Sequence, residues 1–335
     1  MPAALTNAIY MECRLGEGAE GVDLVIRIEK DRLELLREVA ATRSSSLRAH
    51  PAWKRLHAFC EEWADPHSGL GEALDHIWLE FDVPSGGAGA PAVPSVFARL
   101  HEHPNGASRH PSSERVHRVL RALLGSTLSD GLTQSLGRCM AALPDSAQPA
   151  YIGVMFSRCI DAARLCVTGL TDELLMRYLK HIRWPGPAAE VAAIASAVRR
   201  YSPSGATSLL HVDVGERIRP RLGLEYSLAR LDQLKGRFGD EPLLQDFVER
   251  RLCTPVKRQG LLAWPGHSFE SFEHELWESL LVRRVNHVKL VFESGFPLEA
   301  KAYLQFSHRF HARRGNLPQS GPLPESDDRG ACACS

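Results

Sequence analysis

The chain has 335 residues, 44% of them hydrophobic and 24% charged, with 40 basic residues balanced by 40 acidic ones. This composition is that of a globular protein with room for one large domain or two smaller ones. The charge balance lacks the basic footprint of DNA- and RNA-binding proteins, so we expect no nucleic-acid partner.

Other sequence features narrow the class further. None of the eight cysteines falls in a CxxC pair, which argues against a structural zinc site. No run of about 18 apolar residues is present, so we expect no membrane-spanning segment. The first residues show no basic region followed by an apolar run, so we predict a cytoplasmic protein with reduced cysteines.

Five pairs of strand-like segments follow one another along the chain. Each pair consists of two runs of alternating apolar and polar residues around a short polar or glycine-containing connection, which is the signature of a hairpin. The pairs span residues 8–30, 76–100, 151–170, 208–228 and 286–306.

Between the hairpins, apolar residues recur at helical spacing. The apolar positions are Leu33, Leu36 and Val39; Trp53, Leu56, Phe59 and Trp63; Val116, Leu120 and Leu123; Leu132, Leu136 and Met140; Leu175, Leu179 and Ile182; Val191, Ile194, Val198 and Tyr201; Leu231 and Leu234; Leu243, Leu244, Phe247 and Val248; and Phe272, Leu276 and Leu280. We take residues 1–310 as one domain. Residues 311–335 are polar and rich in glycine and proline, and we expect them to form a disordered tail.

The last hairpin has two unlike faces. One carries Lys289, Lys301, Tyr303 and Gln305, whereas the other carries Leu290, Phe292, Ala302 and Leu304. Closing the sheet into a barrel removes its edges, and helices outside the barrel would then cover the apolar face. We therefore predict an α+β fold, a ten-stranded antiparallel β-barrel of five hairpins with a polar lumen and a surrounding ring of helices. The alternative is a five-fold α/β propeller of the pentein kind.

A ten-stranded antiparallel barrel inside a ring of helices resembles the PT barrel, the ABBA fold of aromatic and peptide prenyltransferases. Lys301 and Tyr303 look like the Lys-x-Tyr strand motif of that family's indole enzymes. The resemblance covers most of residues 1–310 and is mainly architectural, and the chain starts on a hairpin where the family usually starts on a helix. It implies transfer of an allylic group from a prenyl diphosphate to a small aromatic or peptide acceptor in natural-product biosynthesis, with magnesium compatible but not required.

The second strand of each predicted hairpin carries one basic residue on the face expected to point into the lumen. These residues are Arg27, Arg99, Arg164, Arg221 and Lys301. In a closed barrel we expect these side chains to converge and, with Lys289 and Tyr303, to bind the diphosphate. Guanidinium and ammonium groups suit phosphate oxygens and stabilise diphosphate as a leaving group.

The rest of the expected site would hold the prenyl group and its acceptor. Trp78, Tyr151, His211 and Gln305 are predicted to form the walls, since aromatic rings stabilise an allylic cation. Glu80 or Asp82 would orient the acceptor or take its proton. No DDxxD-type cluster suggests a metal site.

Acidic residues also occupy lumen-facing positions, so other functions remain possible. Glu12, Glu80, Asp82, Asp213, Glu225 and Glu293 could neutralise the cations in a salt-bridged interior. The chain would then be a non-catalytic protein that binds a peptide, such as a ribosomal natural-product precursor. His211 is either a base steered by Asp213 or a structural histidine, and Cys166 is either a thiolate nucleophile or a small buried thiol. A third hypothesis is pentein-like amidino hydrolysis by Cys166, His211 and Glu225.

Overall fold

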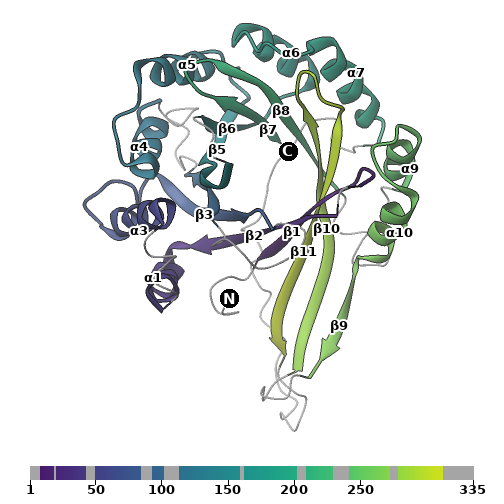
Figure 1. Ribbon diagram of the computed structural model, residues 1–335, viewed down its shortest axis with the longest axis horizontal. Coiled ribbons are helices and arrows are strands. Elements are labelled where there is room, and N and C mark those ends of the chain that lie inside the picture. The colour runs from purple at the N-terminus through teal and green to yellow at the C-terminus, as the bar shows by residue number, and fades with distance from the viewer. Residues whose placement is uncertain are drawn as a thin grey trace, which may run out of the picture.

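The computed structural model describes residues 8–18, 20–42, 50–83, 93–101, 113–158, 162–201, 209–228, 241–271 and 278–311. Within these ranges the chain forms a single antiparallel barrel with helices packed around its outside (Figure 1). The expected tail lies outside the described residues from position 312 onward. So do four expected helical positions, Leu231, Leu234, Phe272 and Leu276.

Ten strands in five hairpins build the barrel. They are β1 (Ile9–Arg14) with β2 (Val22–Glu29), β3 (Leu74–Phe81) with β4 (Pro94–Leu100), β5 (Gln148–Val154) with β6 (Ala163–Thr168), β7 (Leu209–Val214) with β8 (Ile218–Ser227), and β10 (Glu278–Phe292) with β11 (Glu299–His311). Neighbouring strands pair in chain order, and β11 also pairs with β1, which closes the barrel. The predicted fold is confirmed, and the propeller alternative is wrong.

Two helices follow each of the first four hairpins in the described part of the chain. They are α1 (Leu33–Thr42) and α3 (Pro51–Ala64), α4 (Ser113–Leu124) and α5 (Asp130–Ala141), α6 (Asp172–His181) and α7 (Ala188–Arg199), and α9 (Glu241–Glu249) and α10 (Pro255–Ala263). Short 3₁₀ turns lie at Lys30–Arg32 (η2) and Phe156–Arg158 (η3). None of these helices is long and apolar enough to cross a membrane.

The hydrophobic core lies between the barrel and its helices. Strand residues such as Leu79 and Leu165 point outward and are fully buried against helix residues such as Trp63 and Leu120. Because side chains alternate along a strand, the residues between these apolar positions face the lumen. The helices therefore exclude water from the outer face of the sheet, and the inner face carries the polar side chains.

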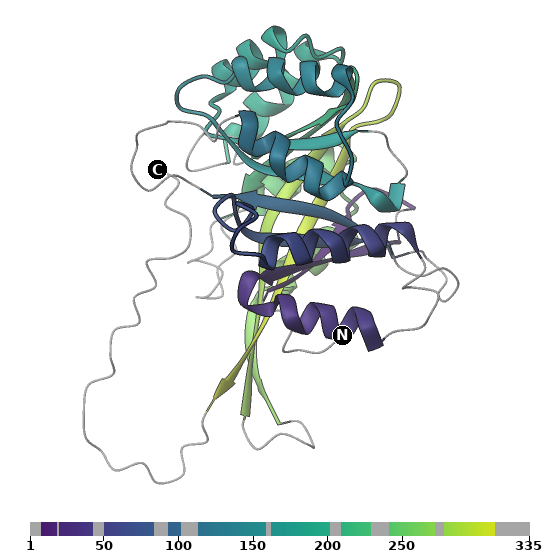
Figure 2. The same ribbon diagram turned by 90° about the vertical axis from the view of Figure 1, so that its left-hand side faces the viewer.

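The structure differs from the expectation around the last hairpin. Leu280, expected in a helix, lies in β10, and the unpredicted β9 (Gly266–Glu270) pairs with residues 279–283 of that strand. The ends of β10 and β11 run together beyond the barrel (Figure 2). Cross-strand pairing therefore overrides the apolar spacing that suggested a helix here, because strand propensity depends on tertiary contacts. The helix α10 was also not predicted.

Candidate functional site

Strand register divides the lumen into two layers. Along β3, His76 and Trp78 come before Glu80 on the same face, with Asp82 directly after the strand, and along β1, Tyr10 comes before Glu12. An aromatic layer consists of Tyr10, His76, Trp78, Phe97 and Tyr151. A charged layer consists of Glu12, Glu80, Arg158, Arg164, His211, Asp213, Arg221, Lys289 and Lys301, all of which line one cavity. On β1 and β3, the aromatic residue therefore lies two positions before the charged residue on the same face.

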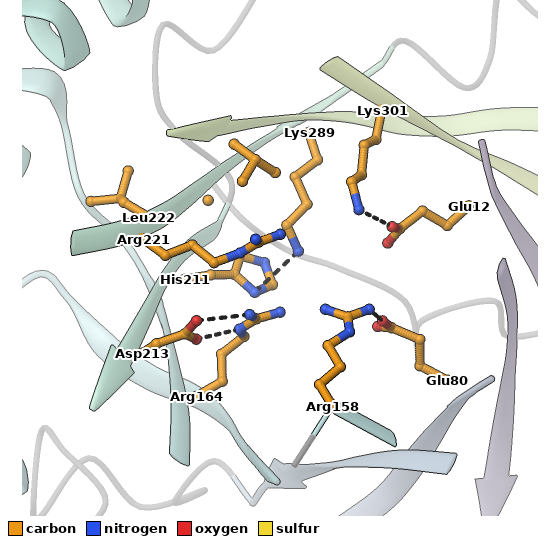
Figure 3. A pocket seen from close by; sticks show the side chains of 12 residues that line it. Glu12, Glu80, Arg158, Arg164, His211, Asp213, Arg221, Leu222, Lys289 and Lys301 are labelled. Atoms are coloured by element: carbon orange, nitrogen blue, oxygen red, sulfur yellow. Dashed lines mark hydrogen bonds and ion pairs between the residues drawn. The ribbon is translucent and has the colours of Figure 1, made fainter. Parts of the chain in front are cut away.

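The charged layer surrounds a small space at which five basic side chains point. Figure 3 shows Arg158, Arg164, Arg221, Lys289 and Lys301 directing their nitrogen atoms toward it. Only three carboxylates, those of Glu12, Glu80 and Asp213, share this wall. The open space is about 10 Å³, which is room for about one water molecule. The cavity is therefore lined by more basic than acidic side chains and is almost filled by them.

Arg164 forms a buried two-point ion pair. Its Nε and Nη2 donate to the two carboxylate oxygens of Asp213 at 2.6 and 3.0 Å. Burial opposes ionisation of both groups, yet the attraction between them lowers the pKa of Asp213 and raises that of Arg164. These two bonds use Nε and Nη2 and leave the third nitrogen, Nη1, outside the ion pair. Arg164 can therefore bind one more anionic oxygen without leaving Asp213.

Glu12 pairs with β11 across the closure of the barrel. Its carboxylate accepts hydrogen bonds from Lys301 and from the hydroxyl of Tyr303. Burial alone would raise the pKa of Glu12, but Lys301 and Lys289 lower it to about 2. The predicted Lys301 and Tyr303 thus lie together, and in this structure they bind a carboxylate of the protein.

Arg158 is the functional residue that the sequence reasoning missed. It lies in η3 after β5, where its Nη2 donates to Glu80 at 2.6 Å and to Asp82 at 2.7 Å, and its Nε donates to Asp82 at 3.2 Å. Burial and the charge of Glu12 raise the pKa of Glu80, whereas the bonds from Arg158 and Ser157 hold that of Asp82 below its ordinary value. The available signal was the pair of acids at the end of β3 and directly after it, Glu80 and Asp82, which needed a basic partner that the strands did not supply.

The remaining two basic groups also have carboxylate partners. Arg221 donates to Glu293 at 2.7 Å, and the Nζ atom of Lys289 lies 3.3 Å from Glu225. All five basic groups of the layer are therefore ion-paired, which is the salt-bridged interior that the sequence left open. Arg164, Arg221 and Lys301, which the sequence left as either diphosphate ligands or internal ion-pair partners, each have a carboxylate partner in this structure.

Two of the five predicted cations lie elsewhere. The guanidinium of Arg27 covers the ring of Trp78 at 5.9 Å, and that of Arg99 covers the ring of Tyr151 at 5.0 Å. Neither residue lines the charged cavity. Their strand positions carry them past the charged layer to the aromatic one, so five second-strand cations do not converge at one point.

The aromatic layer is a connected set of rings. Tyr10 and Trp78 meet edge to face with centroids 5.1 Å apart, and His76 contacts both Trp78 and Tyr151. Burial and the nearby Arg27 and Arg99 lower the pKa of His76 to about 3, so its ring is neutral at pH 7. Trp78 and Tyr151, whose register placed both in the lumen, therefore lie together in one aromatic layer.

His211 lies in the charged layer and not among the aromatic rings with which it was grouped. Its Nε2 lies 2.6 Å from Glu225, and its Nδ1 lies 3.3 Å from both Cys166 and Lys289. Asp213 is engaged by Arg164, so the idea that Asp213 steers His211 is wrong. The structure does bring Cys166, His211 and Glu225 together.

Gln305 is the remaining predicted site residue, and it lies in the lumen with the aromatic rings. Gln305 lies opposite Tyr10 in the register of β1 and β11, at the level of the aromatic layer. In the part of the chain that the structure describes, no group of three or more histidine, cysteine, aspartate or glutamate side chains is arranged to hold a metal ion.

Solved structures with the same architecture include a prenyltransferase and a dimethylallyl tryptophan synthase. The prenyltransferase PriB, in a ternary complex with L-tryptophan and dimethylallyl thiolodiphosphate, matches with a TM-score of 0.53 at 14% identity, over 92% of this chain and 82% of PriB. The 5-dimethylallyl tryptophan synthase from Streptomyces coelicolor, in complex with DMASPP and Trp, matches with a TM-score of 0.51 at 14% identity, over 96% and 86% of the two chains.

Comparisons of the sequence with protein-family models and with curated proteins identified no relative. At identities near 14% the likeness to the solved structures establishes the fold alone. On that evidence, together with the closed ten-stranded barrel and its helices, this chain has the PT-barrel fold of the ABBA prenyltransferases.

Proposed function

We propose that the protein transfers an allylic group from a prenyl diphosphate to an aromatic acceptor inside the barrel. The observation that carries this proposal is that five basic groups converge on one small cavity, two residues along the strands from a layer of aromatic rings. The reaction needs both features, because the diphosphate leaves with negative charge while the allylic carbon becomes cationic. PriB, which shares the fold, was solved with tryptophan and a dimethylallyl thiolodiphosphate.

The diphosphate would enter by replacing weak ion pairs. Arg221 and Glu293 form the most exposed pair of the five, with 28% and 34% of their side chains accessible, so separating them costs little. Arg158, Arg164 and Lys301, which line the same cavity, would then contact the ligand. Charge-assisted hydrogen bonds from these groups offset the cost of moving the anion out of water.

The acceptor would lie against the aromatic layer. Trp78 and Tyr151 supply ring faces for the allylic cation, and Glu80 ends the same strand face two residues after Trp78. Burial raises the pKa of Glu80, which makes it a stronger base than an ordinary glutamate once it is ionised. We assign Glu80 the role of receiving the acceptor's proton, and Asp82, held by Arg158 and Ser157, the role of positioning that arginine.

Incubation with dimethylallyl diphosphate and L-tryptophan tests the proposal. We expect a prenylated tryptophan in the mass spectrum and release of one diphosphate per product. The matched variant removes a whole ion pair, Arg164→Met with Asp213→Leu, so that no buried charge is left without a partner. This double variant should fold and bind dimethylallyl diphosphate at least about tenfold more weakly by calorimetry. Unchanged affinity would exclude the charged layer as the diphosphate site.

One observation favours a second candidate, a peptide-binding protein without chemistry. Every basic group of the charged layer already has a carboxylate partner, and about 10 Å³ remains open. A neutralised interior of this kind suits a zwitterionic peptide at the barrel mouth, such as a ribosomal natural-product precursor. A melting temperature that stays constant with millimolar dimethylallyl diphosphate, but rises with binders selected from a random peptide library, would favour this candidate over the enzyme.

A further inference from the structure

Cys166 lies where the two layers of the lumen meet. Its side chain is buried and packs with Phe97 and Met155, next to the rings of Trp78 and Tyr151. On its other side it faces His211, its direct cross-strand partner in β7, with Sγ 3.3 Å from Nδ1. An allylic carbon held between the diphosphate groups and the aromatic rings would therefore lie beside this sulfur atom.

The contacts of His211 define where its proton is. Its Nε2 lies 2.6 Å from a carboxylate oxygen of Glu225, in a contact bent away from ideal hydrogen-bond geometry. Burial would raise the pKa of Glu225, but the nearby histidines and Lys289 hold it well below its ordinary value, so the carboxylate is ionised. A nitrogen this close to a carboxylate carries the proton, and Nδ1 is then the acceptor.

Two donors share that one acceptor. The thiol of Cys166 and the ammonium of Lys289 both lie 3.3 Å from Nδ1 of His211. Gly223 permits this arrangement, since a Cβ atom at that position would lie 2.8 Å from Cε of Lys289 and 3.3 Å from Cβ of His211. Lys289 therefore reaches across β8 to occupy the base that Cys166 would need.

Without a bound anion, Cys166 and His211 are both uncharged. Burial raises the pKa of Cys166 to about 12, and burial together with Lys289 lowers that of His211 to about 4. Lys289 acts on His211 in two ways, since it occupies Nδ1 and its charge opposes an imidazolium, and an anion that draws Lys289 toward itself removes both. The charge of Lys289 also lowers the pKa of Cys166, so the reactivity gained comes from the freed base His211. Glu225 remains in place to stabilise the imidazolium through Nε2.

We propose that Cys166 is an internal acceptor of the prenyl group, with His211 as its base and Lys289 as the group that releases this base when a diphosphate binds. The inference rests on the proposed function, in that it requires a prenyl diphosphate in the charged layer. In the step, the allylic carbon–oxygen bond breaks and its electron pair leaves with diphosphate. A carbon–sulfur bond forms at Sγ, and the thiol proton moves to Nδ1 of His211.

The first test omits any other acceptor. The full chain is incubated with dimethylallyl diphosphate, and peptides are mapped by mass spectrometry. We expect one dimethylallyl group on Cys166 and none on Cys60 or Cys139, which are equally buried and share a pKa raised to about 12, but lie in α3 and α5 outside the lumen. Cys166→Ala should carry no adduct.

The outcomes separate the two proposals. Transfer to tryptophan without an adduct on Cys166 overturns the thiol proposal and leaves the enzyme intact. An adduct on Cys166 without transfer to tryptophan supports the thiol proposal and overturns the aromatic acceptor. Absence of both overturns both.

A second test needs no prenyl transfer. Iodoacetamide alkylation of Cys166 is followed with and without inorganic diphosphate, and we expect the anion to raise the rate at least about tenfold because it draws Lys289 from His211. Lys289→Gln should react fast without the anion, and His211→Asn slowly with or without it. A rate indifferent to inorganic diphosphate, with the Lys289→Gln rate unchanged from that of the wild-type chain, overturns the role given to Lys289.

Discussion

The charged and aromatic layers lie two residues apart along the same strands, yet they are held together by different forces. In the charged layer each basic group has a carboxylate partner, and the pairs nearly fill the space between the strands. In the aromatic layer the rings meet edge to face, with arginines over two of them. The charged layer therefore depends on complete pairing and the aromatic layer on shape, and substitutions should affect the two in different ways.

The largest effect should come from breaking one buried pair. Arg164→Met leaves the carboxylate of Asp213 buried without its two-point partner. We expect the free energy of unfolding to fall by about 3–5 kcal/mol, as for other buried ion pairs that lose one member. Urea unfolding followed by circular dichroism measures this loss.

The control for this prediction is the double variant Arg164→Met with Asp213→Leu. It should recover most of the lost stability, because two apolar groups replace two charges and none remains unpaired. If the single and the double variant were equally unstable, the charge of Asp213 would not be the cause of the loss.

The next effect concerns pH and His211. In the folded chain the pKa of His211 is about 4, against an ordinary value of 6.5, so the unfolded chain takes up the proton first as pH falls. Stability should therefore decrease as pH falls from 6.5 toward 4, by up to about 3 kcal/mol from this residue. His211→Asn should flatten the decrease in urea midpoints between about pH 7 and pH 5. An identical slope in both proteins would mean that His211 protonates normally in the folded state.

The fold was largely predictable because periodicity is a local signal that repeats. Five hairpins separated by helical spacing specify which face of each strand is apolar, and closure follows from the need to remove sheet edges. The failure at Leu280 shows the limit of this reasoning. An apolar spacing compatible with a helix became a long strand because β9 and β11 were available as partners, which no local pattern of residues records.

The candidate site was only partly predictable, because register shows which face a residue occupies but not its level in the barrel or its partner. Lys301 and Tyr303 were placed correctly in the lumen, yet their shared partner Glu12 lies 289 and 291 residues away. Arg27 and Arg99 have the correct face but the wrong level. Such pairings depend on long-range closure, which alternation along one strand does not encode.

Matched glycine substitutions compare the two layers directly. In the aromatic layer, a Cβ atom on Gly153 would lie 2.3 Å from the ring of Phe97 and 2.9 Å from the carbonyl oxygen of Val96, neither of which can move easily. In the charged layer, a Cβ atom on Gly223 would first meet the flexible side chain of Lys289. We expect Gly153→Ala to cost about 1–3 kcal/mol and Gly223→Ala less than about 1 kcal/mol in urea unfolding. Equal costs would show that the charged layer is as rigid as the aromatic one.

The smallest effect on stability should come from the pair at the rim of the charged layer. Arg221 and Glu293 are about one-third exposed, and water screens their attraction at 2.7 Å. Arg221→Gln should therefore change the free energy of unfolding by less than about 1 kcal/mol. If the rim is where a diphosphate enters, the same variant should weaken dimethylallyl diphosphate binding several-fold by calorimetry. A variant that loses stability as Arg164→Met does, but binds the diphosphate normally, would show that this arginine is a structural partner and that the ligand enters the barrel elsewhere.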